Sequence, residues 1–532
     1  MKLILEACPI CILLHYQSII LNAGLVVGSA AACLEEIVAL ALERHGIYIA
    51  GEWREPAGKA YFPTYNPYTQ QPWAEISQAD ASDVRTAVAV ARECFDRTWS
   101  RTSGLQRARL LNRLADIIEA NAPEMGALET RDNGKVIRET TSQLKFLART
   151  FRFYAGYCDK IFGKVIPLDR PDMFDYASLE PLGVVGIITA WNSPMALLGN
   201  KLPAALAAGN CVVIKPSEHA SVTTLKFVRL VEEAGFPPGV VNVVTGDGRA
   251  GEALVGGGGL GKISFTGSGG VGRKIAAAAG ANLTPVILEL GGKSPNIIFE
   301  DADLKKAANG ALAGIFAATG QTCIAGSRLL VQRSVYSQVV DMLVDRAGRI
   351  RLGDPSDMAT EMGTVANQPQ FDRVMHFIES AKGQGARLIA GGERATGTGL
   401  SQGLFVKPTI FADVHNQMAL AREEIFGPVL SVIPFDTEEE AVRIANDTSF
   451  GLASGIWSQN INRVHRVARE LRTGMVWVNT YRAVAAQTPF GGVKDSGFGR
   501  ERGHEGMLEF LVSKNVMINF SEDDRDPFAV QT

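Results

Sequence analysis

Cys323 is a candidate nucleophile of this chain. It lies in the stretch GQTCIAGSR (residues 320–328), directly after an alanine-rich run. A cysteine in such company usually packs as a small apolar residue, but a thiolate is also a strong nucleophile. The local sequence leaves both interpretations open.

Two polar residues are predicted to lie just past strand ends. Asn192, in ITAWNSP (residues 188–194), could donate its amide to a developing oxyanion, although an Asx turn before proline is the more common use of asparagine there. Glu289, in ELGGKSP (residues 289–295), precedes two glycines that would let the backbone approach a neighbour closely. It could act as a base or bind a ribose, whereas a lone glutamate at a strand end is more often a surface residue.

A glycine-rich turn suggests a nucleotide site. FTGSGGVG (residues 265–272) matches G-x-G-x-x-G at Gly267, Gly269 and Gly272, between a predicted strand and a predicted helix. Glu289 follows at the end of the next strand, in the position of the ribose ligand of a Rossmann fingerprint. A glycine turn without a nucleotide is the alternative.

Other motifs are weaker in isolation. In IKPSEHA (residues 214–220), Lys215 and Glu218 could hold the two hydroxyls of a ribose, or form a solvated ion pair on a capped helix. EEIFGPV (residues 423–429) and TPFGGVKDSGFGRERG (residues 488–503) would each be an ordinary loop.

The elements that must position these residues alternate regularly. Short apolar runs separated by helical patterns predict βαβ units and a parallel sheet covered on both faces. Ligands then bind at the carboxyl ends of the strands. A second α/β region is expected from about residue 307. The predicted strands of the first region cover residues 183–189, 211–215, 239–246, 262–267 and 285–292.

Composition limits the classes of function. A chain of 532 residues is too long for one core, so two or three domains are expected. A net charge of −3 implies no basic surface for nucleic acid. The seven cysteines are mostly far apart and odd in number. They predict no disulfide framework and no metal site, but a reducing, cytoplasmic compartment.

The first 45 residues differ from the rest. They are apolar, but polar residues interrupt every run before it reaches the roughly 18 residues of a membrane span. We weigh an extra amphipathic segment, a weak targeting sequence and translated upstream DNA. The third is favoured, because a self-contained pattern begins at GIYIAGEW (residues 46–53).

Taken together, the motifs resemble the aldehyde dehydrogenase superfamily. WNSP, KPSE, FTGS, ELGGKSP, GQTC, EIFGPV and PFGGVKDSG occur in the order of that family, and the resemblance runs from about residue 46 to residue 519. It implies a modified Rossmann NAD-binding domain with a parallel sheet, an α/β catalytic domain and a small β oligomerisation arm. The type it indicates is NAD-dependent and non-acylating.

The resemblance reassigns the cofactor residues. In that family the glycine pattern that binds the nucleotide is G-x-x-x-x-G, which corresponds here to Gly267 and Gly272. The residues implied to bind the ribose are then Lys215 and Glu218 instead of Glu289. The Glu218 carboxylate would repel the extra phosphate of NADP, so NAD is expected. The remaining predicted cofactor residues include a nicotinamide-ribose ligand, Glu424, and a ring contact, Phe426, together with Trp191, Ser217, Gly246, Ser268 and Leu290.

The resemblance also implies a reaction. Cys323 as thiolate attacks the aldehyde, and the Asn192 amide with the Cys323 backbone N–H holds the oxyanion. Hydride passes to the nicotinamide and leaves a thioester. Glu289 is then the base that activates water to hydrolyse it. Lys201 and Lys293 match positions that support the site electrostatically.

Departures from the family pattern concern the substrate tunnel. Ser193 stands where many relatives carry phenylalanine, and Ala196 and Asn200 fall where bulkier residues often line the tunnel. Arg482 lies in the loop at the tunnel mouth. These residues predict a wider, more polar tunnel and an aldehyde with a carboxylate or another polar group, unless Arg482 is merely an exposed loop residue.

Other classes of function remain open at this point. A CoA-acylating relative would typically lack the base at Glu289. An ordinary Rossmann dehydrogenase would use Glu289 on ribose, and a catalytically idle homologue would have lost Cys323, Glu289 or Asn192.

We expect a homodimer or a homotetramer that pairs exposed strand edges. The expected division is an N-terminal extension (1–45), an NAD-binding domain (46–158 and 182–291), a catalytic domain (292–497) and oligomerisation arms (159–181 and 505–521).

Overall fold

The computed structural model describes residues 42–522 and residue 528. Residues 1–41 lie outside this range. They make up nearly all of the N-terminal segment (1–45) for which an amphipathic segment, a targeting sequence and translated upstream DNA were weighed. Glu43–His45, at the end of that segment, form strand β1 and pair in parallel with β5. Paired structure therefore begins slightly before residue 46.

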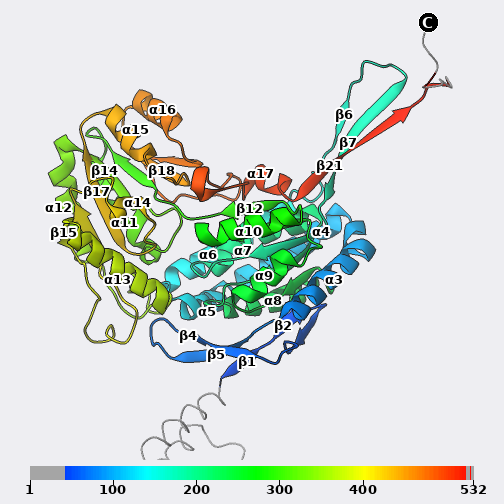
Figure 1. The fold of residues 1–532 in the computed structure, drawn as a ribbon, viewed down its shortest axis with the longest axis horizontal. Coiled ribbons are helices and arrows are strands. Elements are labelled where there is room, and N and C mark those ends of the chain that lie inside the picture. The colour runs from blue at the N-terminus through cyan, green and yellow to red at the C-terminus, as the bar shows by residue number, and fades with distance from the viewer. Residues whose placement is uncertain (1–41, 523–527, 529–532) are drawn as a thin grey trace, which may run out of the picture.

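The larger lobe is built on an eight-stranded sheet (Figure 1). Its central strands are parallel, and β8 is buried at every position because helices cover both faces. In spatial order the strands are β20 (Gly497–Phe498), β12 (Val286–Glu289), β11 (Lys262–Thr266), β8 (Val184–Ile188), β9 (Cys211–Lys215), β10 (Val241–Val243), β2 (Ile47–Ile49) and β3 (Glu52–Arg54).

The helices of this lobe have clear sequence causes. Asp80 caps α3 in a reciprocal capping box, and Gly209 ends α7 in the left-handed conformation. The helices are α3 (Ala81–Arg97), α4 (Gly104–Ala120), α5 (Ala122–Asn133), α6 (Ile137–Ala155), α7 (Pro194–Ala208), α8 (Val222–Ala234), α9 (Gly248–Gly256) and α10 (Gly269–Ala281).

The smaller lobe holds a seven-stranded sheet, parallel except for its edge strand β15. The strands in order are β15 (Arg387–Ala390), β16 (Thr409–Ala412), β17 (Val429–Phe435), β14 (Arg328–Gln332), β13 (Pro295–Ile298), β18 (Ala453–Trp457) and β19 (Met475–Val478). Its helices are α11 (Leu304–Phe316), α12 (Tyr336–Ala347), α13 (Gln368–Gly383), α14 (Ala419–Arg422), α15 (Glu438–Asn446) and α16 (Ile461–Glu470).

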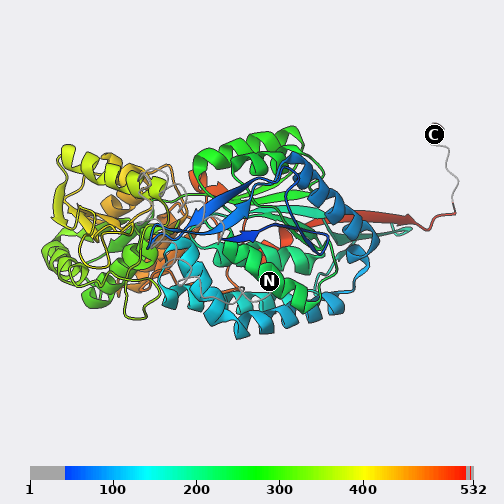
Figure 2. The ribbon, with the colours of Figure 1, turned by 90° about the horizontal axis from the view of Figure 1, so that it is seen from below.

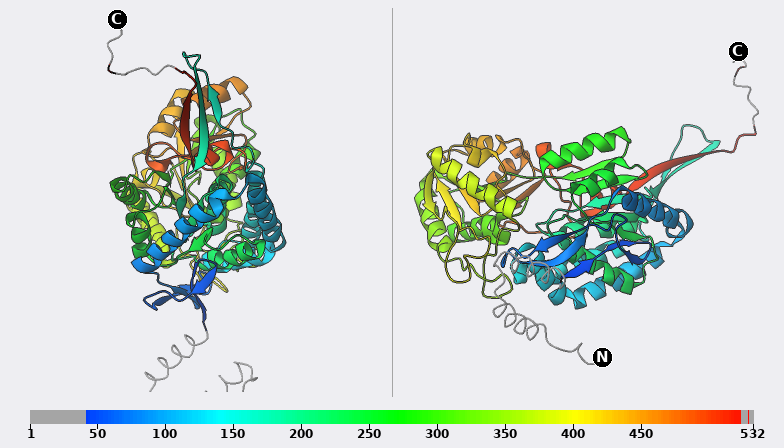
Figure 3. Two further views of the ribbon diagram at one scale, coloured as in Figure 1. Left: turned by 90° about the vertical axis from the view of Figure 1, so that its right-hand side faces the viewer. Right: turned by 60° about the horizontal axis from the view of Figure 1, so that its bottom comes forward.

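Two three-stranded sheets complete the molecule. One, made of β1, β5 (Pro72–Ser77) and β4 (Tyr61–Tyr65), borders the larger lobe. The other projects as an arm and is made of β6 (Lys164–Ile166), β7 (Met173–Pro181) and β21 (Leu511–Asn519), which follows the short helix α17 (Gly503–Leu508). Figures 2 and 3 show the arm standing clear of the lobes, at the end opposite the seven-stranded sheet.

The predicted fold class is confirmed: an α/β chain with a Rossmann-like parallel sheet, a second α/β lobe and a small β arm. The sequence pattern missed β13, β15 and β18, and it did not show that β20 returns to the first sheet. Among the residues described, no helix combines the length and the apolar character that crossing a membrane requires.

The order of the strands marks the place for a ligand. From β8 the chain moves outward through β9 and β10, then returns to place β11 and β12 on the other side of β8. The carboxyl ends of β8 and β11 therefore border a topological switch point, where open α/β sheets bind ligands.

Candidate active site

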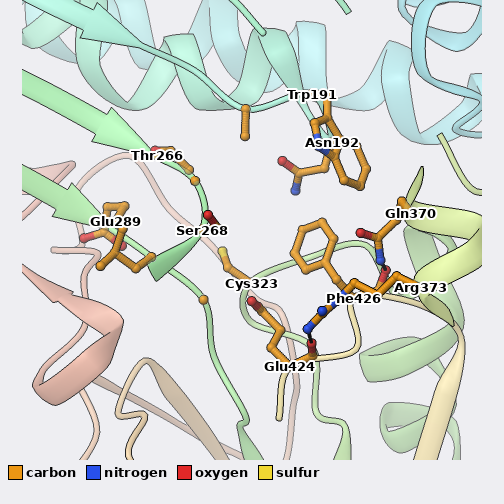
Figure 4. Close-up of a pocket in the computed structure, with 14 residues that line it drawn as sticks. Trp191, Asn192, Thr266, Ser268, Glu289, Cys323, Gln370, Arg373, Glu424 and Phe426 are labelled. Atoms are coloured by element: carbon orange, nitrogen blue, oxygen red, sulfur yellow. Dashed lines mark hydrogen bonds between the residues drawn. The ribbon is translucent and has the colours of Figure 1, made fainter. Parts of the chain in front are cut away.

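A cavity of about 370 Å³ lies at this switch point, where the two lobes meet. Figure 4 shows the sulfur of Cys323 on its wall, between Glu289 and Phe426, with the Asn192 amide nearby. The lining residues come from loops after β8, β11 and β12 and from the smaller lobe: Ala190, Trp191, Asn192, Thr266, Gly267, Ser268, Glu289, Leu290, Gly291, Cys323, Gln370, Arg373, Glu424 and Phe426.

The chain turns sharply just before Cys323. Ala318, Thr319 and Gly320 adopt left-handed φ angles of 51°, 56° and 69° in succession, directly after α11. Such angles are costly for non-glycine residues and cluster at functional sites. Cys323 itself is only half-buried, whereas the other three cysteines that the structure describes, Cys94, Cys158 and Cys211, are buried. Cys323 is therefore the one described cysteine that packs against a core and also lines the cavity.

Two glycines permit the close packing around the cavity. A Cβ on Gly291 would come within 2.1 Å of the Glu424 carboxylate, and one on Gly292 within 2.4 Å of the Cys323 carbonyl oxygen. The backbone N–H of Gly292 donates to Glu424 over 3.0 Å. The GG pair of ELGGKSP thus brings the end of β12 against both Cys323 and Glu424.

Glu289 is a buried carboxylate without a hydrogen bond. It ends β12 and is 2% exposed, and neither oxygen has a hydrogen-bond partner among the described residues. Burial, followed by the negative charge of Glu501, raises the pKa of Glu289 well above its ordinary value. Glu424, the other carboxylate on the cavity wall, is tied to Gly292. Glu289 is therefore the carboxylate free to take a proton.

The Cys323 thiol is held in its protonated form. Burial raises its pKa to about 12, helped by the charges of Glu289 and Glu424, and the backbone N–H of Ile324 opposes the rise only weakly. Carboxylates around a buried sulfur disfavour a second negative charge, so the proton must leave when the sulfur reacts.

Asn192 is fixed on the cavity wall by neighbouring backbone. It is 8% exposed, and its side-chain amide donates one hydrogen bond to the Gln321 carbonyl over 2.8 Å. Asn133 in turn donates to the Asn192 carbonyl over 3.3 Å. An amide nitrogen carries two hydrogens, so the second remains available to a ligand oxygen.

Lys201 lies beside the site rather than on its wall. It is fully buried in α7 and forms an ion pair with Glu501, which is 2% exposed. Glu501 in turn raises the pKa of Glu289. The pair thus connects Lys201 electrostatically to the carboxylate of Glu289, which fits the supporting position expected for it. Lys293, also fully buried, has its pKa lowered to about 7 by burial.

Aromatic and polar residues border the cavity on the cofactor side. The rings of Trp191 and Phe426 meet edge to face with centroids 5.4 Å apart. Gln370 donates to the Phe426 carbonyl over 2.9 Å, and Arg373 donates to the Glu424 carbonyl over 2.8 Å. Gln370 and Arg373 were not predicted; they lie on α13, where no motif marks them.

The other predicted cofactor residues divide into two groups. Gly267, Ser268 and Leu290 line the cavity, and the Ser268 hydroxyl caps α10. Gly272 lies within α10, where a Cβ would come within 2.5 Å of Leu290. Gly246, after β10, does not line the cavity.

The ribose residues expected from KPSE lie one strand away. Lys215 ends β9, and its ammonium group lies 3.3 Å from Glu218. The Ser217 hydroxyl also contacts Glu218, over 3.4 Å. Because β9 is adjacent to β8, this group extends the site along the carboxyl edge of the sheet.

The predicted tunnel residues on α7 share one face of that helix. Ala196 is the one residue of α7 that is not buried, and Ser193 and Asn200 lie three positions before it and four after it. The Ser193 hydroxyl accepts from Lys135 over 2.5 Å, and the Asn200 amide oxygen accepts from Arg502 over 2.7 Å. Two cations are thus held by this face.

Arg482, the fourth predicted tunnel residue, is half-buried in its loop and has a φ of 61°. One of its terminal nitrogens donates to the Ala313 carbonyl over 3.2 Å. It interacts electrostatically with Lys135, so it belongs to the same positive region.

Comparison with known proteins places the chain in a family. The profile of the aldehyde dehydrogenase family matches residues 53–516. The chain is 43% identical over 495 residues to (Z)-2-((N-methylformamido)methylene)-5-hydroxybutyrolactone dehydrogenase of Acinetobacter baylyi, covering 92% of this chain and 100% of that protein. It is 44% identical over 477 residues to the mitochondrial aldehyde dehydrogenase of Equus caballus, covering 89% and 94%.

Solved structures agree. The betaine aldehyde dehydrogenase of Staphylococcus aureus in complex with NAD+ superposes with a TM-score of 0.90 at 38% identity, over 91% of this chain and 97% of that one. The fold and the cavity define a nucleotide-dependent oxidoreductase with a cysteine at its centre. The chain belongs to the aldehyde dehydrogenase family.

Proposed function

We propose that this chain oxidises an aldehyde to its carboxylic acid through a thioester on Cys323, with NAD as cofactor. One observation carries the assignment of roles: a half-buried thiol, an amide donor and a carboxylate without a hydrogen bond line the same cavity. A direct test is NADH formation by the purified chain with a panel of aliphatic, aromatic, amino and carboxylated aldehydes. No NADH with any of them would refute the proposal.

The first half of the reaction uses Cys323 and Asn192. The sulfur forms a bond to the carbonyl carbon, and the thiol proton leaves to solvent. The oxygen becomes an oxyanion, which accepts hydrogen bonds from the second amide hydrogen of Asn192 and from the Cys323 backbone N–H. One such donor typically contributes about 3–4 kcal/mol to the transition state.

The second half uses Glu289. When bound, NAD supplies the acceptor for the hydride that leaves the thiohemiacetal carbon. A thioester then remains on Cys323. Glu289 takes a proton from water and the hydroxide adds to the thioester carbon. The C–S bond then breaks to release the acid, and Glu289 returns its proton to the leaving sulfur, which regenerates the thiol. A free carboxylate at this position favours hydrolysis over transfer of the acyl group to CoA.

The residues present suit NAD. The cavity has the size of a site for a nicotinamide and its ribose, with Glu424 positioned for the ribose hydroxyls and Phe426 for the ring. The N-terminus of α10 faces the same cavity through Ser268 and suits a phosphate. Lys215 and Glu218 would hold the adenosine ribose.

Replacement of Glu218 is predicted to relax the preference for NAD. Its carboxylate is partly exposed and stands where a ribose phosphate would lie, so Glu218→Gln removes a charge repulsion. We expect kcat/KM with NADP to rise by about tenfold relative to kcat/KM with NAD. Steady-state kinetics with both cofactors measure this ratio, and Glu252→Gln, a glutamate on α9, serves as the matched control. An unchanged ratio would remove Glu218 from the ribose site.

The rate is predicted to rise with pH through the neutral range. Cys323 and Glu289 both act in their deprotonated forms, and the pKa values of both lie above the ordinary ones. Acid therefore suppresses both half-reactions, and alkali restores them. Profiles of kcat and kcat/KM from about pH 6 to about pH 9 test this. A profile that falls over that range would contradict the assigned protonation states.

The proposed substrate carries a polar or carboxylate group. Ser193 and Asn200 are small polar residues at positions expected to line the tunnel, and both hold cations. Arg482 adds a further positive charge near them.

The proposed assembly is a homodimer or homotetramer. The arm formed by β6, β7 and β21 exposes apolar side chains, among them Phe174, Val512 and Met517, which a second copy would cover. The proposed compartment is the cytoplasm, in keeping with four free thiols among the described cysteines. Sedimentation of the purified chain distinguishes the two assemblies from a monomer.

A further inference from the structure

Arg502 is a buried cation that forms no ion pair among the described residues. It lies in the loop before α17 and is 6% exposed. Among the described residues, no carboxylate forms an ion pair with it. The one hydrogen bond that its side chain makes to these residues runs from Nε to Asn200. Buried charges in proteins are normally paired, because transfer of an ion from water into the protein costs on the order of several kcal/mol.

The neighbours of Arg502 fix its plane and leave its end free. The guanidinium lies 5.3 Å from the ring centroid of Phe146 and 4.9 Å from that of Phe490. Asn200 holds the Nε edge. The two terminal nitrogens have no hydrogen-bond partner among the described residues, and they are not fully enclosed by protein. Four N–H donors in a planar fork are thus available, the geometry that binds a carboxylate through two bonds.

Arg502 also lies close to the reacting groups. It interacts electrostatically with Glu501, Cys323 and Glu289, and Glu501 itself forms an ion pair with Lys201. Asn200, its anchor, lies on the face of α7 that leads back to Ser193 and Asn192. Arg502 is thus tied through Asn200 to the helix whose N-terminal end adjoins Asn192 on the cavity wall.

We propose that Arg502, oriented by Asn200, binds the carboxylate of an aldehyde substrate, so that the natural substrates are oxo acids. This rests on the proposed aldehyde oxidation and narrows its substrate class. A carboxylate would supply the missing counter-charge and satisfy the open donors at once. Arg482 is less suited, because it is only half-buried and already bonds the Ala313 carbonyl.

The test compares a short series of ω-oxo carboxylic acids with the corresponding alkanals. For an oxo acid and an alkanal of the same chain length, we expect the kcat/KM of the wild type to be at least about tenfold higher with the oxo acid. Arg502→Gln should lower that ratio about 100-fold, mainly through KM, and Arg502→Lys should lower it less. Arg482→Gln, at the other candidate arginine, should lower the ratio less than Arg502→Gln does. Arg149→Gln, at an exposed position of α6, is the matched control and should shift the ratio by less than about threefold.

Three results would overturn the proposal: no preference for any oxo acid, an unchanged ratio in Arg502→Gln, or a loss confined to Arg482→Gln. Should Arg502→Gln fail to fold, competitive inhibition of the wild type decides. Glutarate must then inhibit more strongly than its uncharged diamide, and equal inhibition would also overturn the proposal. Oxidation of alkanals without a preference would leave the aldehyde chemistry intact, whereas no oxidation of any aldehyde would refute that chemistry itself.

Discussion

Replacement of Cys323 by alanine is expected to abolish aldehyde oxidation. The side chain supplies the bond through which the reaction proceeds, and no other thiol of residues 42–522 lines the cavity. Removing a covalent nucleophile typically costs about 10⁴-fold or more in kcat. NADH formation under saturating aldehyde and NAD measures this loss.

The control for that variant is another cysteine. Cys158→Ala removes a thiol that is buried in the larger lobe, away from the cavity, and donates to the Tyr154 carbonyl over 3.6 Å. It should keep wild-type kinetics while testing the general effect of losing a thiol. If Cys323→Ala retained more than about one hundredth of the wild-type kcat with intact folding, Cys323 would not be the nucleophile.

Replacement of Glu289 by glutamine is expected to arrest the second half of the reaction. Glutamine keeps the shape of the side chain but cannot accept a proton from water. Loss of a general base typically lowers the rate about 10²–10⁴-fold. Hydride transfer requires the sulfur and the oxyanion donors, so the first turnover should still release NADH. Rapid mixing is expected to show a burst of NADH followed by a slow steady state.

Thermal unfolding separates this effect from misfolding. The folded-state pKa of Glu289 is raised, so the contribution of Glu289 to stability is most favourable where its carboxyl is protonated in both states, and it is lost as pH rises above the ordinary glutamate value through the folded-state pKa. Glutamine carries no such charge. Glu289→Gln should therefore unfold at a temperature no lower than the wild type at alkaline pH, and a large drop in Tm would make its kinetics uninformative about the base.

A loss of NAD affinity would have a different meaning. An ordinary Rossmann dehydrogenase would use this glutamate on ribose, and Glu289→Gln would then weaken cofactor binding with the chemistry intact. The position of Glu289 near Glu501 and Arg502, and its place on the wall with Cys323, favour the base.

The sequence predicted elements and site residues well where a short motif determines its own local structure. Strand–turn–helix units such as IKPSEHA and FTGSGGVG specify both the element and the residues at its end, because short apolar runs and helix caps are local signals. Asn192 and Glu289 follow from the same logic. The comparison of all seven motifs then selected Cys323 from seven cysteines that local patterns could not separate.

The features of the site that the sequence did not predict depend on contacts between distant parts of the chain. Lys201 and Glu501 are 300 positions apart, and Asn200 and Arg502 are 302 apart. No periodicity predicts such pairs. The left-handed angles at Ala318 and Thr319 were equally hidden, because tertiary packing imposes them on residues that do not favour them. Arg502 could be found only through its lack of a counter-charge in the folded chain.

The most direct test of the account is mass spectrometry of Glu289→Gln after mixing with an aldehyde and NAD. The account predicts an acyl group on the peptide that contains Cys323, with about one NADH released per chain before turnover stalls. The adduct should be absent without NAD and absent when Cys323 is also replaced. Full turnover without an acylated peptide, or acylation at another residue, would contradict the thioester mechanism at Cys323.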